Sequence, residues 1–272
     1  MLRAMSFAGR VAIVTGGASG IGRGVAARLV ARGGIAILAD IDADAAARTA
    51  VELGPAAHAV ALDVRDGDAV GELVARTAAD HGHLDYIFNN AGIAVMGEAL
   101  ETTAEDWERI VDINLRGVIH GVRAAYPLMV EQGSGHIVNT ASLAGLIASP
   151  GLVAYSATKH AVVGLSRSLR IEAARYGVRV SAVCPGFVRT SIVEHGTLRG
   201  IEREDAEKMP PVWCDVDTAA REILRGVDRN QGVIVVTGHA RVLHRLERYA
   251  PRAVEWIGKL GLRKRMPPRA RP

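Results

Sequence analysis

A tyrosine and a lysine four residues apart, Tyr155 and Lys159, are the first candidates for chemistry in this sequence. They lie near the start of a segment whose spacing predicts a helix, and residues four apart share one helix face. A phenol titrates near ~10, and a neighbouring ammonium favours the phenolate and lowers that pKa. The pair therefore suits proton transfer to or from an oxygen. By itself the spacing is common by chance, and a structural role explains it equally simply.

Two polar residues elsewhere favour the catalytic interpretation. Ser142 follows an apolar run that predicts a strand, 13 residues before Tyr155. At the end of a strand its hydroxyl is placed to hydrogen-bond a substrate oxygen. Asn114 lies inside a helical stretch, where an amide is unfavourable for the helix and calls for another reason to be there. With Tyr155 and Lys159 these residues form the predicted catalytic set.

A glycine-rich turn near the N-terminus predicts a dinucleotide site. It directly follows the first predicted strand and precedes a helical pattern. Glycine permits a tight turn and lets backbone N–H groups approach a pyrophosphate at a helix N-terminus. The spacing is G-x-x-x-G-x-G rather than the commoner G-x-G-x-x-G, and a plain turn is the alternative. Cofactor contacts are expected from Gly16, Ser19, Gly20, Ile21 and Gly22.

Asp40 ends the second predicted strand, 18 residues after Gly22. An acid that binds the adenosine ribose is expected at about this distance. Its carboxylate would accept hydrogen bonds from the ribose hydroxyls and repel a 2′-phosphate. Ile41 follows it, so no cation stands there to hold a phosphate, which favours NAD over NADP. The alternative is that Asp40 caps the helix that begins near Asp42.

Two further strand ends are expected at the same edge, because ligands of open parallel sheets bind at the carboxyl ends of strands. Asp63 closes the third predicted strand and is placed to accept from an adenine amino group, while the Val64 N–H serves a ring nitrogen. A helix cap is the competing role for Asp63. Asn90, Ala91 and Gly92 close the fourth strand, although a turn alone would also explain them.

The elements that must position these residues are seven short apolar runs separated mostly by helical patterns. The runs are nearly continuous in apolar character, which is typical of parallel strands covered on both faces. Repeated strand–helix–strand units predict one doubly wound α/β domain with a seven-stranded parallel sheet and helices on both faces. The predicted strands are 11–14, 35–39, 57–62, 84–88, 136–140, 179–183 and 233–236.

The composition is that of an ordinary globular chain of 272 residues with two cysteines, Cys184 and Cys214. Two thiols fit a reducing compartment better than a disulfide framework. The sequence shows no signal-peptide stretch and no apolar run near the ~18–20 residues of a membrane-spanning helix. A cytoplasmic location is therefore expected.

Positive charge is concentrated at the C-terminus. Residues 239–272 hold ten Lys or Arg and two acids, a net charge of +8, which leaves −4 for residues 1–238. We expect a catalytic domain over 1–238 and a basic helical extension over 239–272, interrupted at Pro251 and disordered from 266 to 272. Its basic stripe is Arg241, Arg245, Arg248 and Arg252, and its apolar stripe is Val242, Leu246, Tyr249, Ala253 and Ile257.

Two roles remain open for this extension. Its apolar stripe could pack on the same or a neighbouring subunit with the arginines in solvent, which is the preferred interpretation. Alternatively, a basic amphipathic segment can lie on an anionic membrane surface. Nucleic-acid binding is not expected, because nothing else in the sequence supports it.

In order and spacing the motifs resemble the classical short-chain dehydrogenase/reductase family over about residues 8–238. The resemblance implies a Rossmann fold, a small-molecule alcohol or ketone substrate, no metal, and a homodimer or homotetramer paired through helices near 104–130 and 155–176. It is carried by the glycine turn, Asn89-Asn90-Ala91-Gly92, Asn114, Ser142, Tyr155 with Lys159, and Pro185-Gly186 with Thr190.

The resemblance also implies a role for each matching residue. Tyr155 is the general acid/base, and Ser142 positions and polarises the substrate oxygen. Lys159 lowers the Tyr155 pKa and binds the nicotinamide ribose, while Asn114 holds a water that links Lys159 to solvent. Asp40 selects NAD. Asn90 helps to hold the cofactor, whose nicotinamide amide and pyrophosphate are lined by Pro185, Gly186, Val188 and Thr190.

The substrate pocket is expected between residues 93–97, 143–150 and 187–213. The last range is the longest stretch without predicted regular structure, which is typical of a lid. Its apolar lining predicts a lipophilic secondary alcohol or ketone of steroid, retinoid, terpenoid or fatty type. An NADPH-dependent ketoreductase and a non-catalytic dinucleotide sensor are the alternatives. The candidate lining residues are Ala94, Leu143, Ala144, Leu146, Phe187, Val193 and Trp213.

Overall fold

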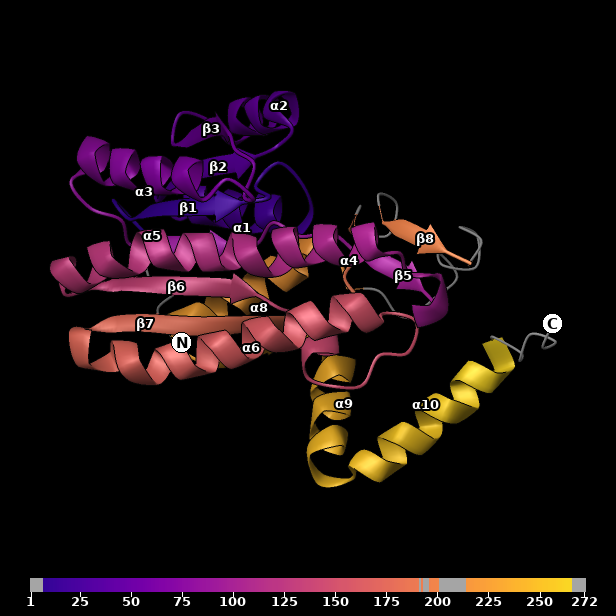
Figure 1. Cartoon of the computed structure of the whole chain (residues 1–272). Helices are drawn as coiled ribbons and strands as arrows, with labels where there is room; N and C mark the ends of the chain where they lie inside the picture. The colour runs from indigo at the N-terminus through magenta and orange to yellow at the C-terminus, as the bar shows by residue number, and fades with distance from the viewer. Residues whose placement is uncertain (1–6, 191, 193–195, 201–213, 266–272) are drawn as a thin grey trace.

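The computed structural model describes residues 7–190, 192, 196–200 and 214–265, with 260–265 described by their backbone alone. A seven-stranded parallel sheet with the order β3-β2-β1-β4-β6-β7-β9 forms its centre (Figure 1). The predicted doubly wound α/β fold is confirmed. The strands are β1 (Val11–Thr15), β2 (Ile35–Asp40), β3 (Ala57–Ala61), β4 (Tyr86–Asn89), β6 (Gly135–Thr140), β7 (Val178–Pro185) and β9 (Val233–Val236).

Helices cover both faces of the sheet, because alternate side chains of each strand point to opposite faces. In β1, Ala12 and Val14 pack in the core shared with α1, α2 and α8. Val11 and Ile13 belong to the other core, which β1 shares with α3, α5 and α6. The helices of these layers are α1 (Gly20–Val30), α2 (Ala43–Leu53), α3 (Gly67–His81), α5 (Gly117–Gln132), α6 (Val153–Ala173) and α8 (Val216–Asp228).

A small second sheet was not expected from the sequence. β5 (Val95–Gly97) pairs in parallel with β8 (Thr197–Arg199). Of the two strands, β8 lies inside the stretch 187–213 that the sequence predicts to lack regular structure. Arg199 fixes β8 to α4 (Ala104–Val111), since its Nε donates to the buried Asp106 carboxylate over 2.7 Å. Strands of three residues are too short to show a period of two, which is why the sequence did not reveal them.

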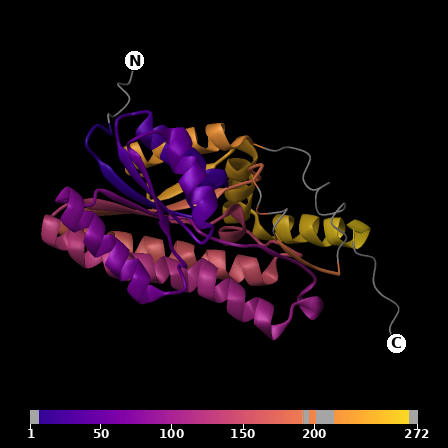
Figure 2. The same cartoon turned by 90° about the horizontal axis from the view of Figure 1, so that it is seen from above.

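The chain continues past the sheet as two helices, α9 (Gly238–Tyr249) and α10 (Pro251–Arg265), separated at the predicted proline. Thr237 caps α9, and the buried Ala240 ties it to the domain. α10 packs mainly on α9 and projects from the body in both views (Figures 1 and 2). In the described part of the chain, no helix is long and apolar enough to cross a membrane. The predicted disordered end, 266–272, lies outside the described residues.

Candidate active site

The glycine turn lies where the strand order reverses, at the carboxyl end of β1 beside β4. Gly16 and Gly20 adopt positive φ angles of 64° and 49°, which favour glycine. A Cβ on Gly22 would lie 2.1 Å from the Gly16 carbonyl oxygen, so the turn has no room for a side chain there. Ser19 precedes α1 and makes no capping hydrogen bond with its side chain. The turn and Ile21 thus present a helix N-terminus of the kind that binds a pyrophosphate.

Asp40 lies directly beside this turn. Its Oδ2 accepts from the Ala18 backbone N–H over 3.0 Å, and its Oδ1 accepts from the Asp42 N–H over 3.2 Å. The N-cap of α2 is Asp42, which accepts from Ala45, so the alternative that Asp40 caps this helix is wrong. The neighbouring Ile41 is exposed. Asp40 therefore joins the end of β2 to the glycine turn and keeps a carboxylate at the cofactor edge.

Asp63 pairs with a nearby cation, Arg65, two residues further along the chain. Arg65 donates from Nε to the Asp63 carboxylate over 2.8 Å, and this hydrogen bond lowers the pKa of Asp63. The N-cap of α3 is Asp66, so Asp63 is not a helix cap either. Val64 is buried, and its carbonyl oxygen lies 2.9 Å from Nδ1 of His120.

Asn90 braces the glycine turn from β4. Its Nδ2 donates to the carbonyl oxygens of Thr15 and Gly16 over 3.1 and 3.3 Å. The backbone N–H groups of Asn90 and Ala91 donate to the Thr15 hydroxyl over 2.9 and 3.0 Å. The adjoining Gly92 leaves space for the catalytic set, since a Cβ there would lie 3.4 Å from Nζ of Lys159.

Tyr155 lies in the first turn of α6, and Ser142 acts on its phenol by lowering the pKa. Ser142 begins the short helix η3 (Leu143–Gly145) and accepts from the Ala144 N–H over 3.1 Å. Burial raises the pKa of Tyr155, and Ser142 opposes that rise. The lowering expected from Lys159 stays a prediction.

Lys159 is buried one turn further along α6. Its Nζ lies 5.5 Å from the centre of the Tyr155 ring and donates to the Thr140 carbonyl oxygen over 2.9 Å. Burial lowers the pKa of Lys159 to about 8. The ammonium is therefore held under the tyrosine by the end of β6 and loses its proton far more readily than an exposed lysine.

Asn114 lies in a π-helical turn, η2 (Asp112–Arg116), between α4 and α5. Its Oδ1 accepts from the Ile93 N–H over 2.8 Å and its Nδ2 donates to the Ile93 carbonyl over 2.9 Å. A longer bond of 3.4 Å joins Nδ2 to Thr158 on α6. These contacts explain an amide in a helix interior: Asn114 fixes the chain after β4 beside the Tyr155–Lys159 face.

The chain after β7 is held by a residue that the sequence did not indicate, His239. A Cβ on Gly186, next to Pro185, would lie 2.4 Å from Nε2 of His239. The same nitrogen accepts from the Phe187 N–H over 3.2 Å, and the two rings stack. Further on, Thr190 packs against the glycine turn, 3.3 Å from a Cβ on Gly20. Val188 is buried and pairs with Cys214.

The described pocket residues are apolar, and Leu143 and Ala144 directly follow Ser142. Ala94, Leu143 and Ala144 are buried, Leu146 is half-buried, and Phe187 is 39% exposed. The candidates Val193 and Trp213 lie outside the described residues. No group of His, Cys, Asp or Glu that could hold a metal ion occurs among the residues that the structure covers.

Comparisons with known proteins agree with this geometry. The chain belongs to the short-chain dehydrogenase family, whose model matches residues 10–198. It is 35% identical to the putative oxidoreductase SadH of Mycobacterium tuberculosis, over 96% of this chain and 98% of SadH. It is 43% identical to a 2-dehydro-3-deoxy-L-rhamnonate dehydrogenase (NAD(+)) of Sphingomonas, over 69% of this chain and 76% of that protein.

The chain is also similar to a solved structure that contains a bound cofactor. A short-chain dehydrogenase/reductase from Burkholderia phymatum in complex with NAD superimposes with a TM-score of 0.81 at 30% identity, over 92% of this chain and 96% of that chain. The chain is thus an oxidoreductase of a family that binds nicotinamide dinucleotides. The glycine turn, with no room for a Cβ at Gly22, fits such a group.

Proposed function

We propose that the protein is an NAD-dependent dehydrogenase that interconverts a secondary alcohol and a ketone, with Tyr155 as the general acid/base. The observation that carries this proposal is the position of the Lys159 Nζ, 5.5 Å from the centre of the Tyr155 ring, beside a phenol whose pKa Ser142 lowers. We propose that this phenol and the Ser142 hydroxyl meet the same substrate oxygen. The dinucleotide, when bound, supplies or accepts the hydride.

The chain's own residues divide the remaining work. In the oxidation direction, Tyr155 takes the hydroxyl proton while the Ser142 hydroxyl holds the substrate oxygen; in reduction Tyr155 returns a proton. Lys159 favours the phenolate through its charge and is placed to bind a ribose hydroxyl. Asn114 fixes the backbone at Ile93 and, in this proposal, holds a water that passes the Lys159 proton to solvent. General acid–base catalysis of this kind contributes about 10²–10⁴ in rate.

Asp40 supports NAD rather than NADP as the cofactor. Its carboxylate stays beside the glycine turn through Ala18, where a 2′-phosphate would meet a like charge. The exposed neighbour Ile41 offers no positive charge. The names of the Burkholderia structure and the Sphingomonas relative mention NAD and NAD(+), respectively. Asn90, Pro185, Gly186, Val188 and Thr190 complete the proposed cofactor site, with Asp63 and Val64 at its adenine end.

The apolar surroundings of the site support a lipophilic substrate. Leu143, Ala144 and Ala94 present no charged group, and the nearby Phe187 remains partly exposed. Burying apolar substrate surface is favourable by about 25 cal/mol per Å², whereas a phosphate or carboxylate would find no described charged partner among these residues. We therefore propose a secondary alcohol or ketone of steroid, retinoid, terpenoid or fatty type.

A screen of lipophilic secondary alcohols with NAD tests the proposed function. We expect NADH formation with some of them, and a markedly slower reaction when NADP replaces NAD. Tight NADH binding without turnover of any alcohol or ketone would favour a dinucleotide sensor. Turnover only with NADPH and ketones would instead indicate a ketoreductase and contradict the role given to Asp40.

We further propose a homodimer or homotetramer that pairs through α5 and α6, in keeping with the exposed Val153 and Ile171 on α6. Both cysteines are free thiols, which supports a reducing, cytoplasmic setting. The extension from residue 239 is proposed to pack on a neighbouring subunit, and a peripheral membrane contact is the alternative, because α10 exposes Trp256 and Ile257 within a strongly basic segment.

A further inference from the structure

The first turn of α9 lies against the chain that follows β7, where the proposed function places the nicotinamide end of the cofactor. Nε2 of His239 accepts from the Phe187 N–H over 3.2 Å, and the two rings stack with their centres 5.4 Å apart. A Cβ on Gly186 would lie 2.4 Å from the same nitrogen, so only glycine allows this close approach. A residue beyond the last strand of the sheet thus contacts the cofactor edge.

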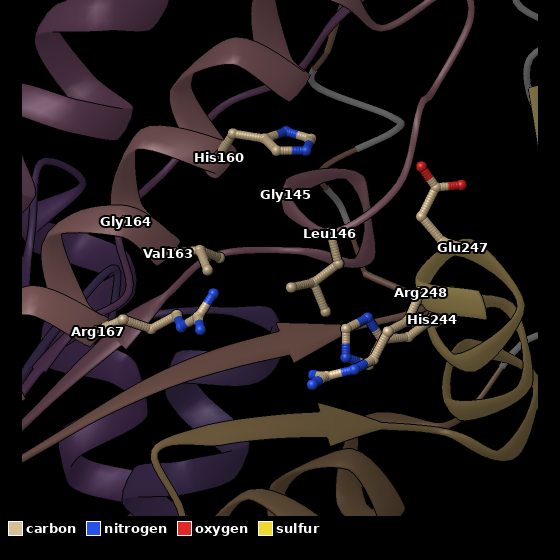
Figure 3. A pocket seen from close by; sticks show the side chains of 9 residues that line it. All are labelled: Gly145, Leu146, His160, Val163, Gly164, Arg167, His244, Glu247 and Arg248. Atoms are coloured by element: carbon tan, nitrogen blue, oxygen red, sulfur yellow. The ribbon is translucent and has the colours of Figure 1, made fainter. Parts of the chain in front are cut away.

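The contact between α9 and this part of the chain comes from the start of the helix. The atoms nearest to a Cβ on Gly186 belong to His239, Thr237 and Ala240. Ala240 is the one buried residue of α9. Further along the helix, His244 lines a cavity of about 370 Å³ together with Leu146, the residue after η3 (Figure 3). The first turn of α9 therefore differs from the rest of the helix in its contact with the cofactor edge.

The position of His239 is fixed by Thr237 and by α8. Thr237 adopts a φ of 83°, and such strain at a residue other than glycine persists only where the surrounding structure imposes it. Its N–H donates to Oε2 of Glu222 on α8 over 3.0 Å, and Glu222 also pairs with Arg241 over 2.6 Å. The Thr237 hydroxyl oxygen lies 3.2 Å from Nε2 of His239. The imidazole is thus held in place before any cofactor binds.

The hydrogen bond to Phe187 requires a neutral imidazole. A ring nitrogen that accepts from a backbone N–H carries no proton, so the proton of His239 lies on Nδ1. Burial lowers the pKa of His239, which keeps the ring neutral near pH 7. A side chain of similar size without an acceptor would fill the same space but leave the Phe187 N–H unpaired. The chemistry of His239, and not only its volume, therefore matters here.

Phe187 in turn determines the orientation of the next peptide group. Its carbonyl oxygen accepts from the Cys214 N–H over 2.8 Å, and the Cys214 carbonyl oxygen accepts from the Arg189 N–H over 2.9 Å. Neither bond uses the N–H of the buried Val188, which lies between them. Phe187 is held at its N–H by His239 and at its carbonyl by Cys214. That carbonyl shares one peptide plane with the Val188 N–H, so both bonds set the direction of this donor.

We propose that His239 is a positioning residue for the nicotinamide end of the cofactor, because it holds Phe187 and thereby directs the Val188 N–H. The inference rests on the proposed function for the place of the nicotinamide. It assigns the first turn of α9 to the active site and only the remainder to the extension. The adenosine end is proposed to lie beside Asp40 and the glycine turn, so His239 should affect one half of the dinucleotide and spare the other.

Titration of the whole chain with NADH and with ADP-ribose, which lacks the nicotinamide, tests the proposal. His239→Leu removes the acceptor and should weaken NADH binding about tenfold, the size expected when one buried N–H loses its partner. Its ADP-ribose affinity should stay within about twofold of wild type. His239→Gln, whose amide oxygen can accept from Phe187, should recover most of the NADH affinity. The control His244→Gln, on the same helix, should leave both affinities within about twofold.

Equal losses of NADH and ADP-ribose affinity in His239→Leu would overturn the proposal, and so would equal NADH affinities of His239→Leu and His239→Gln. If His239→Leu does not fold, Gly186→Ala tests the same contact from the other side. Its Cβ would displace the imidazole, so NADH should bind more weakly and ADP-ribose as before; unchanged NADH affinity would contradict the inference.

The same titrations separate this inference from the proposed function, because they need no turnover. A wild type that binds NADH more tightly than ADP-ribose but oxidises no alcohol would refute the proposed dehydrogenase alone, and the variants would still decide the role of His239. A wild type that binds NADH no more tightly than ADP-ribose would overturn the positioning role, since the nicotinamide would then gain nothing from this part of the site.

Discussion

The Lys159 ammonium lies behind the Tyr155 ring, 5.5 Å from its centre, and its hydrogen bond goes to the Thr140 carbonyl oxygen rather than to the tyrosine hydroxyl. Lys159 therefore lies behind the tyrosine ring and is bonded elsewhere, while Ser142 lowers the pKa of the phenol. With its pKa lowered to about 8 by burial, Lys159 is poised to exchange a proton near neutral pH.

Replacing Asp40 with asparagine tests the cofactor choice. The amide keeps most of the shape beside Ala18 but removes the negative charge that opposes a 2′-phosphate. We expect the ratio of NADH to NADPH affinity to fall about tenfold or more, a change of ~1.4 kcal/mol or larger. Fluorescence titration with each cofactor measures it, with Asp44→Asn as a control in the first turn of α2. An unchanged ratio would exclude Asp40 as the selecting residue.

Asn114→Ala tests the contact that holds the chain after β4. The change leaves the Ile93 N–H and carbonyl without the partners that lie 2.8 and 2.9 Å away. Each buried polar group left unpaired costs about 1–3 kcal/mol, so urea unfolding should show a loss of that order. Asn114→Asp keeps the acceptor and should lose less. Equal stability of all three forms would show that Ile93 finds other partners.

His136 should make the stability depend on pH in acid. It is buried on β6, its Nε2 lies 2.8 Å from the Ser181 hydroxyl, and burial lowers its pKa to about 3. Below the unfolded value of ~6.5 the unfolded chain takes up a proton that the folded chain refuses. The free energy of unfolding therefore falls as pH drops from 6.5 toward 3, by up to ~1.4 kcal/mol per pH unit.

Urea unfolding at pH 7, 6, 5 and 4 measures this effect against His136→Gln, whose amide can still donate to Ser181. The variant should lose less stability than the wild type over that range. Parallel curves for the two proteins would mean that His136 accepts its proton without difficulty in the fold.

The alternative role of the extension, a membrane contact, predicts a dependence on lipid charge. Trp256 and Ile257 are 63% and 53% exposed on α10, and basic amphipathic helices bind anionic surfaces. The chain should sediment with phosphatidylserine vesicles and remain in solution with phosphatidylcholine alone. Replacing both residues with glutamine should reduce sedimentation at least about fivefold, while Val51→Gln, a change at a more exposed apolar residue on α2, should not. Equal sedimentation of the two variants would show that Trp256 and Ile257 on α10 do not bind the vesicles.

Much of this site could be predicted from the sequence because its side chains recur at fixed distances along the chain. Ser142 follows a strand end, and Tyr155 and Lys159 lie near the start of a helix. Parallel strands bring their carboxyl ends, and the residues that follow them, to one edge of the sheet. Asn114 stood out because an amide is out of place in a helix.

Other contacts could not be predicted, because their partners are backbone groups or distant residues. The carbonyl of Thr140 that holds Lys159, and the backbone of Ile93 that binds Asn114, carry no signal in residue type. His239 contacts Gly186 and Phe187, although it lies 52 residues after Phe187 in the sequence. The possible cap roles of Asp40 and Asp63 failed because neighbouring aspartates, two or three residues on, formed the caps instead.

The effect of burial on the pKa of Tyr155 could not be predicted for a different reason. A sequence shows which charge is near but not how much water is excluded, and exclusion of water raises the pKa of this phenol. The same burial lowers the pKa of Lys159, which reduces the charge available to the tyrosine above about pH 8.

The most direct test of the central claim is the turnover of Tyr155→Phe with NAD and an alcohol that the wild type oxidises. The variant removes only the hydroxyl, so NADH affinity and the unfolding midpoint should stay close to wild type. We expect kcat to fall by about 10²–10⁴, the contribution of a general acid/base. A variant that binds NADH normally and retains wild-type kcat would contradict the account, because no proton would then pass through Tyr155.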